Sequence, residues 1–151
     1  IKHETQVWLE ITTLLIPGKN DSDAELDAMT QWIAQQLGAD VPLHFSAFHP
    51  DWKMQDIPAT PIETLLNARK IAKSNGLRHV YIGNVHHKQA SSSYCPHCGQ
   101  CLIGREQYVL SDWNLDATGH CTQCGHALAG RFDAQPGSWG ARRLPVEIAT
   151  G

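Results

Sequence analysis

The chain has 151 residues, a length that fits one domain or one small domain followed by a module. A hydrophobic fraction of 42% and a charged fraction of 18% are typical of a globular protein and exclude an intrinsically disordered chain. With 12 Lys and Arg against 15 Asp and Glu, the net charge is −3. There is thus no basic excess to cover a phosphate backbone, and nucleic acid is not an expected partner.

The N-terminal region is not typical of an export signal or a membrane span. Its apolar run, residues 7–16, is far shorter than the roughly 20 apolar residues that cross a bilayer. It also lacks the basic start and the small-residue cleavage site of a signal peptide. We therefore expect a cytoplasmic protein without a membrane partner, in which thiols stay reduced. Because the chain starts at Ile1 and enters a strand pattern almost at once, we expect it to be the C-terminal part of a longer protein.

The first predicted strand and helix occupy residues 7–37. The strand, residues 7–16, is nearly continuous in apolar and β-branched residues, which predicts burial on both of its faces. Turn residues follow, and Ser22 with Glu25 forms the pattern of a capping box at a helix start. The helix has one apolar stripe, made of Leu26, Met29, Ile33 and Leu37. Gly38 ends it.

Residues 43–85 repeat this alternation. A strand over residues 43–48 precedes a helix that we expect Thr60 to cap, with Pro61 at its first position and Glu63 completing a second capping box. On this helix Leu65, Ala68 and Ala72 lie on one face, with Ile62 and Leu66 beside them. The dipeptide Asn75-Gly76 ends the helix, and a third strand covers residues 79–85. This βαβαβ order predicts a parallel sheet with right-handed crossovers.

Three strands are few for a parallel sheet, and both edges would leave backbone groups unpaired. We therefore expect the last strands of a larger sheet or barrel. In such folds ligands bind at the carboxyl ends of the strands, here residues 13–18, 46–51 and 83–87.

Several polar residues near these strands are candidates for ligand contact. Glu10 lies in the apolar strand pattern, where a carboxylate is costly unless it is paired or faces a cavity. Its presence there favours a polar barrel interior. His49, followed by Asp51, Trp52 and Lys53, is a candidate ligand residue at a strand end. His44, within a strand, is interpreted as a satisfied core histidine. The pair at residues 86–87 is interpreted as part of a solvated loop.

The polar, serine-rich residues 88–93 predict a domain boundary, which divides the chain into residues 1–90 and 91–151. All five cysteines lie beyond it, and four form two Cys-x-x-Cys pairs, Cys95 with Cys98 and Cys121 with Cys124, each followed by Gly. The 22 residues between the pairs leave room for a hairpin, with strand candidates at residues 102–103 and 108–110. Four thiolates at one tetrahedral centre suit Zn²⁺ or a single iron, as in rubredoxin. A structural zinc is expected, because four protein ligands leave no open position; two disulfides are the alternative.

The other thiol and the neighbouring histidines are not needed as ligands. Cys101 lies three residues beyond Cys98, past the tight turn, and is interpreted as an incidental, partly buried cysteine. His97, His120 and His126 flank the pairs and are interpreted as surface residues or as neighbours of the ligands.

Taken in order, these segments resemble a known family. The relevant stretches are LLIPGKND at residues 14–21, HFSAFHPDWKM at residues 44–54, YIGNV at residues 81–85 and YCPHCG at residues 94–99. Their succession resembles the radical SAM enzymes of the AmmeMemoRadiSam system, which are similar to pyruvate formate-lyase activating enzymes and end in such a Cys module. The resemblance covers about residues 7–131.

The resemblance implies the last βα units of a partial (β/α) radical SAM barrel followed by a small rubredoxin-like or zinc-ribbon module. It also implies a [4Fe–4S] cluster and S-adenosylmethionine, with reductive cleavage to a 5′-deoxyadenosyl radical. By this likeness Thr12, Leu14 and His49 fall at cofactor-contacting positions, although the family has a basic residue in place of Thr12. The family's Cys-x-x-x-Cys-x-x-Cys loop is absent, and Cys95, Cys98 and Cys101 have a different spacing. The chain alone is therefore expected to be inactive.

Two other interpretations remain open. One is a non-enzymatic zinc-ribbon module on an α/β scaffold that binds a partner protein or nucleic acid, for which Arg131, Arg142 and Arg143 offer the basic candidates. The other is rubredoxin-like electron transfer by iron at the four cysteines. The substrate is unknown, and a protein of the same system is a candidate partner.

Overall fold

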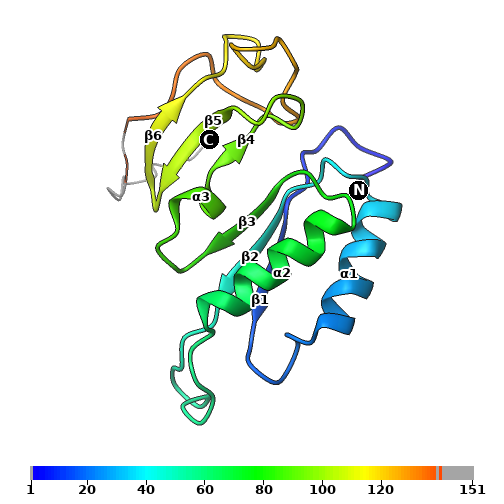
Figure 1. Cartoon of the computed structure of the whole chain (residues 1–151), viewed down its shortest axis with the longest axis vertical. Coiled ribbons are helices and arrows are strands. Elements are labelled where there is room, and N and C mark those ends of the chain that lie inside the picture. The colour runs from blue at the N-terminus through cyan, green and yellow to red at the C-terminus, as the bar shows by residue number, and fades with distance from the viewer. Residues whose placement is uncertain (1, 139, 141–151) are drawn as a thin grey trace, which may run out of the picture.

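The computed structural model describes residues 2–138 and 140 as two small sheets (Figure 1). The first is parallel, in the order β1-β2-β3, and consists of β1 (Ile11–Leu15), β2 (Leu43–Ala47) and β3 (Val80–Gly83). The second is antiparallel, in the order β4-β5-β6, and consists of β4 (Ser93–Tyr94), β5 (Cys101–Glu106) and β6 (Val109–Trp113). The helices are α1 (Asp23–Gln36), α2 (Ile62–Ser74) and the short α3 (Lys88–Ser91), which lies between the sheets. The mixed α/β class is therefore confirmed.

Helices α1 and α2 cover one face of the parallel sheet. Alternate strand residues point to that face, and the core they form with both helices includes Leu15, Phe45 and Ile82. The other face carries two rows of side chains set by the register, Thr12–His44–Tyr81 and Leu14–Ser46–Gly83. We call this second surface the open face, because neither α1 nor α2 covers it.

The first strand is shorter than predicted. Strand β1 begins at Ile11 instead of Val7, and its exposed residues alternate with half-buried or buried ones instead of the strand being buried on both faces. Leu14 is 44% exposed, whereas its neighbour Leu15 is fully buried. The reason is that α1 and α2 cover a single face, so Leu14 on the open face stays partly exposed.

The predicted cap of α1 is confirmed. The Ser22 hydroxyl accepts a hydrogen bond from the backbone N–H of Glu25, and the Glu25 carboxylate accepts one from that hydroxyl at 2.6 Å. Leu26 and Ile33 are buried, and Met29 and Leu37 pack against the same core. At the helix end Gly38 has a φ of +97°, a conformation that glycine adopts without strain.

The predicted cap of α2 is wrong. The N-cap is Pro61, so this proline precedes the first helical residue, and no side chain caps the helix; Glu63 completes no capping box. The Thr60 hydroxyl instead joins two strand ends, donating to the Leu15 carbonyl at 2.6 Å and accepting from the Phe48 N–H at 2.9 Å. The buried backbone groups of two strands are thus satisfied by a side chain that would otherwise cap a helix.

Replacing Thr60 with valine is expected to lower the free energy of unfolding by about 1–3 kcal/mol, because it leaves the Leu15 carbonyl and the Phe48 N–H without their partner. Urea denaturation followed by circular dichroism measures this difference. Thr60→Ser keeps the hydroxyl and is the matched control. A valine variant as stable as the wild type would contradict the assigned bridge.

The serine-rich stretch after β3 is ordered. It forms α3 and β4, Ser92 and Ser93 are buried, and the Ser92 hydroxyl donates to the Lys88 carbonyl and accepts from the Arg105 N–H.

The hairpin predicted between the Cys pairs is confirmed as β5 and β6. The tail residues Arg142 and Arg143 lie outside the described residues. Within the described chain, no helix has the length and apolar character that a membrane crossing requires.

Candidate metal centre and the adjoining cleft

The two Cys-x-x-Cys segments form turns with the same hydrogen bonds. In the first, the Cys95 N–H donates to the Gln100 carbonyl and the Gly99 N–H donates to the Cys95 carbonyl; in the second, Cys121, His126 and Gly125 repeat this pattern. Both glycines have a positive φ, +76° at Gly99 and +72° at Gly125. A side chain would be strained there, which explains why glycine follows each pair.

The four sulfur atoms of these turns converge. All lie within 4.8 Å of one another, with Cys95 Sγ 3.6 Å from Cys124 Sγ and Cys98 Sγ 3.7 Å from Cys121 Sγ. A tetrahedral zinc with Zn–S bonds of about 2.3 Å requires sulfur separations of about 3.8 Å. The donor set therefore fits one zinc or iron ion, and the predicted ligands Cys95, Cys98, Cys121 and Cys124 come together.

The surroundings of Cys95 favour its thiolate. Burial alone would raise the pKa of this thiol, but the backbone N–H groups of Cys98 and His97 and the Cys124 thiol donate to its sulfur and lower the pKa to about 7. Metals bind the thiolate form.

The remaining sulfur and the nearby histidines lie outside the four-cysteine group. Cys101 is partly buried at the start of β5, as predicted, and burial raises the pKa of its thiol. His97 and His126 stack on each other with ring centres 5.7 Å apart, one from each turn. The His120 ring accepts or donates a hydrogen bond at the Thr118 hydroxyl.

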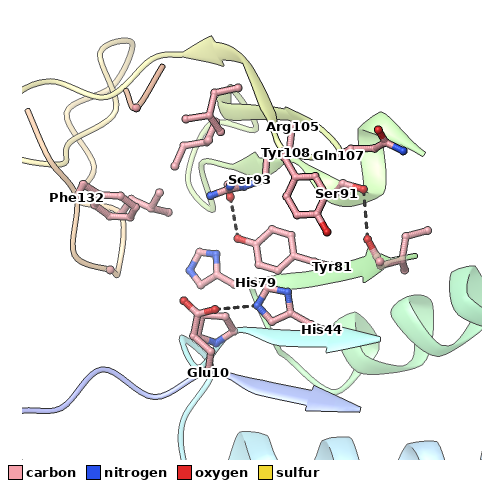
Figure 2. A pocket seen from close by; sticks show the side chains of 18 of the residues that line it. Glu10, His44, His79, Tyr81, Ser91, Ser93, Arg105, Gln107, Tyr108 and Phe132 are labelled. Carbon is pink, nitrogen blue, oxygen red and sulfur yellow. Dashed lines mark hydrogen bonds and ion pairs between the residues drawn. The ribbon is translucent and has the colours of Figure 1, made fainter. Parts of the chain in front are cut away.

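A cleft of about 1010 Å³ lies between the open face and the Cys module (Figure 2). Strands β2 and β3 supply His44 and Tyr81, and the β5–β6 hairpin supplies Arg105 and Tyr108. The segment at 128–137 supplies Phe132. Three stretches that are distant in sequence thus enclose one space.

The sheet side of this cleft carries a connected series of polar side chains. The two carboxylate oxygens of Glu10 accept from the indole N–H of Trp8 and from His44 Nε2, both at 2.9 Å. The His44 ring stacks on Tyr81 with ring centres 5.0 Å apart, and the Tyr81 hydroxyl is 2.8 Å from Ser93 Oγ. Burial raises the pKa of Tyr81, although Ser93 and the charge of Arg105 act in the opposite direction.

These contacts answer two sequence expectations. Glu10 is paired and faces a cavity, as its position in an apolar strand pattern required. His44 is not a core histidine: its side chain is 34% exposed and lies on the open face. The cause is the register, which sends Leu43 and Phe45 into the core and His44 to the opposite side.

The three predicted cofactor contacts lie at different places. Thr12 and Leu14 are exposed on the open face, outside the residues that line the cleft. His49 lines the cleft, and its Nε2 is 3.2 Å from the Asn84 carbonyl oxygen. Its sequence neighbours form a separate exposed contact, with Lys53 Nζ 4.4 Å from the ring centre of Trp52.

Residues 86–87 do more than form a solvated loop. The His87 ring caps α3 by accepting from the Ala90 N–H, and His86 Nε2 is 3.1 Å from Gln107 Nε2 at the hairpin tip.

The sequence did not predict Tyr81, Ser93 and Arg105 as cleft residues. Strand alternation could have placed Tyr81 on the open face, but no sequence signal specified that the Cys module would turn its hairpin toward that face.

The chain is 46% identical over 110 residues to an uncharacterized protein of Methanocaldococcus jannaschii. The match covers 73% of this chain and 33% of the relative, so the chain spans about a third of the length of the curated relative it matches. No protein-family model and no solved structure matches the chain.

Proposed function

We propose that the chain is the closing part of a radical SAM enzyme of the AmmeMemoRadiSam type, carrying a structural zinc at its four cysteines. The observation that supports this best is the open face. Parallel sheets are generally covered on both faces, yet α1 and α2 both cover the same side of β1-β2-β3. A half-barrel has this asymmetry, because its second face lines the interior.

The composition of the open face also favours a barrel interior. Thr12, His44, Ser46 and Tyr81 point to it, and Glu10 lies beside them, so the surface is more polar than a helix-packing face. Strand β1 is an edge of the described sheet, paired with β2 alone. In our proposal, earlier strands of a longer protein pair with this edge.

The residues of this chain do not fit a [4Fe–4S] cluster. Cys101 stands apart from the four converging sulfurs, and the remaining cysteines are used at the single metal centre. We propose that the cluster belongs to a part of the longer protein that this sequence does not contain. When bound there, the cluster and S-adenosylmethionine would supply the 5′-deoxyadenosyl radical. Thr12, Leu14 and His49 would contribute the late-strand side of the cofactor site.

The second candidate is a zinc-ribbon module that binds a partner without catalysis. The converging cysteines favour it equally, since four protein ligands leave no position for a substrate. The basic surface that this candidate needs has little support. Arg131 donates to the Gln6 carbonyl and Asp133 lies two residues away, and the other two arginines lie outside the described residues. Salt-sensitive binding to nucleic acid would support this candidate.

The radical SAM proposal is tested by product formation. The longer M. jannaschii relative, reconstituted with iron and sulfide and given S-adenosylmethionine and dithionite, is expected to form 5′-deoxyadenosine. The 151-residue chain, treated identically, is expected to form none. A relative that binds iron and sulfide but forms no 5′-deoxyadenosine would contradict the proposal. Cluster-dependent product from this chain alone would contradict its assignment as an incomplete, inactive part.

A further inference from the structure

The cleft between the open face and the Cys module carries a proton acceptor whose orientation is fixed. Glu10 accepts from His44 Nε2, and a carboxylate can only accept, so Nε2 bears the hydrogen. In the neutral ring Nδ1 is then an acceptor, and no residue within 2–138 hydrogen-bonds to it. The indole N–H of Trp8 donates to the other oxygen of Glu10, so both carboxylate oxygens are hydrogen-bonded. When its ring is neutral, His44 therefore offers a lone pair on the sheet side of the cleft.

The opposite side of the cleft offers a cation. Arg105 extends from β5 above Tyr81 (Figure 2), and its positive charge acts to lower the pKa of the Tyr81 hydroxyl. Among the described residues, no carboxylate forms an ion pair with Arg105. The carboxylate of Glu10 is already engaged at both oxygens, and Asp112 on the neighbouring strand pairs with Lys88 at 3.2 Å. An unpaired guanidinium presents a planar fork that matches a carboxylate.

Aromatic side chains also line the cleft. Trp8 lies on the sheet side, Tyr108 is 76% exposed on the hairpin, and Trp113 and Phe132 belong to the module. Rings of this kind present flat apolar surface to a planar ligand. The cleft therefore combines a cation, a fixed acceptor and aromatic walls.

We propose that this cleft binds a small aromatic carboxylate whose ring also carries a hydroxyl or N–H donor. Arg105 pairs with the carboxylate, the aromatic side chains contact the ring, and His44 Nδ1 accepts the hydrogen bond from the donor. The metal centre contributes indirectly, because it holds together the module that carries Arg105. The inference rests on the described cleft and not on the radical SAM proposal: a chain that forms no 5′-deoxyadenosine is still expected to bind these compounds.

The test uses four probes and the zinc-loaded 151-residue chain: benzoate, 3-hydroxybenzoate, 4-hydroxybenzoate and benzamidine. Binding is followed by ¹H–¹⁵N NMR titration. Benzoate is expected to bind and benzamidine, its cationic analogue, to bind at least about tenfold more weakly. At least one hydroxybenzoate is expected to bind about 3–10-fold more tightly than benzoate, because of the additional hydrogen bond.

Three variants separate the contributions of Arg105 and His44 to ligand binding. Arg105→Gln is expected to weaken the binding of every benzoate by about tenfold or more, whereas Arg78→Gln, whose guanidinium pairs with Asp40 outside the cleft, changes it by less than about twofold. His44→Phe keeps a ring beside Tyr81 and is expected to remove the advantage of the hydroxybenzoate while leaving benzoate binding unchanged. The NMR spectrum of each free variant establishes that it is folded.

Three results would overturn the proposal: benzamidine binding as well as benzoate, Arg105→Gln binding like the wild type, or a hydroxyl advantage that survives in folded His44→Phe. Failure of 5′-deoxyadenosine formation would leave these binding results unaffected, so the two proposals fail separately.

Discussion

Replacing Cys95 with serine is expected to abolish metal binding and to unfold the antiparallel sheet while the parallel sheet stays folded. The module has a small core of its own, in which two of the buried residues, Cys95 and Cys121, are ligands. A structural zinc site supplies folding free energy directly, because its ligands are not preassembled in the unfolded chain. The parallel sheet has a separate and larger core with α1 and α2.

A ¹H–¹⁵N NMR spectrum of the zinc-treated Cys95→Ser chain measures this outcome residue by residue. We expect the amide signals of β5 and β6 to collapse into the unfolded range and those of β2 and β3 to keep their dispersion. Cys101→Ser is the matched control, since it also removes one thiol of this module but not a ligand. If Cys101→Ser lost the module and Cys95→Ser kept it, the ligand assignment would be wrong.

Leu15→Ala is expected to destabilise the parallel sheet by about 2–5 kcal/mol, whereas Leu14→Ala changes the stability of the same chain by no more than about 0.5 kcal/mol. The two residues are adjacent in β1 and chemically identical, but Leu15 is fully buried and Leu14 is 44% exposed. Truncating Leu15 leaves a cavity against the core, and truncating Leu14 removes contact mainly with solvent.

Urea denaturation of both variants, monitored by circular dichroism, gives the change in the free energy of unfolding that each substitution causes. Equal costs would mean that the open face is covered in the chain and would remove the main support for the half-barrel. In the longer protein, where our proposal places other strands beside β1, Leu14→Ala is expected to become more costly than in this chain.

Local patterns in the sequence predicted most of the elements. The apolar stripe of α1, its Ser22 cap and its end at Gly38 are all formed as predicted, because helix starts and ends depend on residues within one turn. The Cys pairs likewise carry their own turn geometry, so their spacing was enough to predict four converging sulfurs.

Features that depend on distant segments could not be read in this way. Thr60 has the local signature of a cap, but its hydroxyl is taken by the ends of β1 and β2, 45 and 12 residues away in sequence. The partial exposure of His44 likewise depends on which sheet face the helices cover, and a single strand pattern does not contain that information. The cleft exists only because α3 places the module beside the open face.

The metal centre and the cleft are linked through the chain. Strands β5 and β6 lie between the two Cys pairs, and the segment that carries Phe132 follows the second pair directly. A metal that closes the four-cysteine site therefore fixes both module walls of the cleft. The shape of the cleft therefore depends on the four-cysteine centre.

Elemental analysis of the purified 151-residue chain, combined with its mass under native conditions, tests this centre most directly. We expect one zinc per chain, colourless protein, and loss of that zinc on adding a strong chelator. One iron per chain, with a red, redox-active protein, would support a rubredoxin-like centre instead of the structural zinc. A metal-free chain whose mass is reduced by the hydrogens of two disulfides would contradict the metal centre altogether.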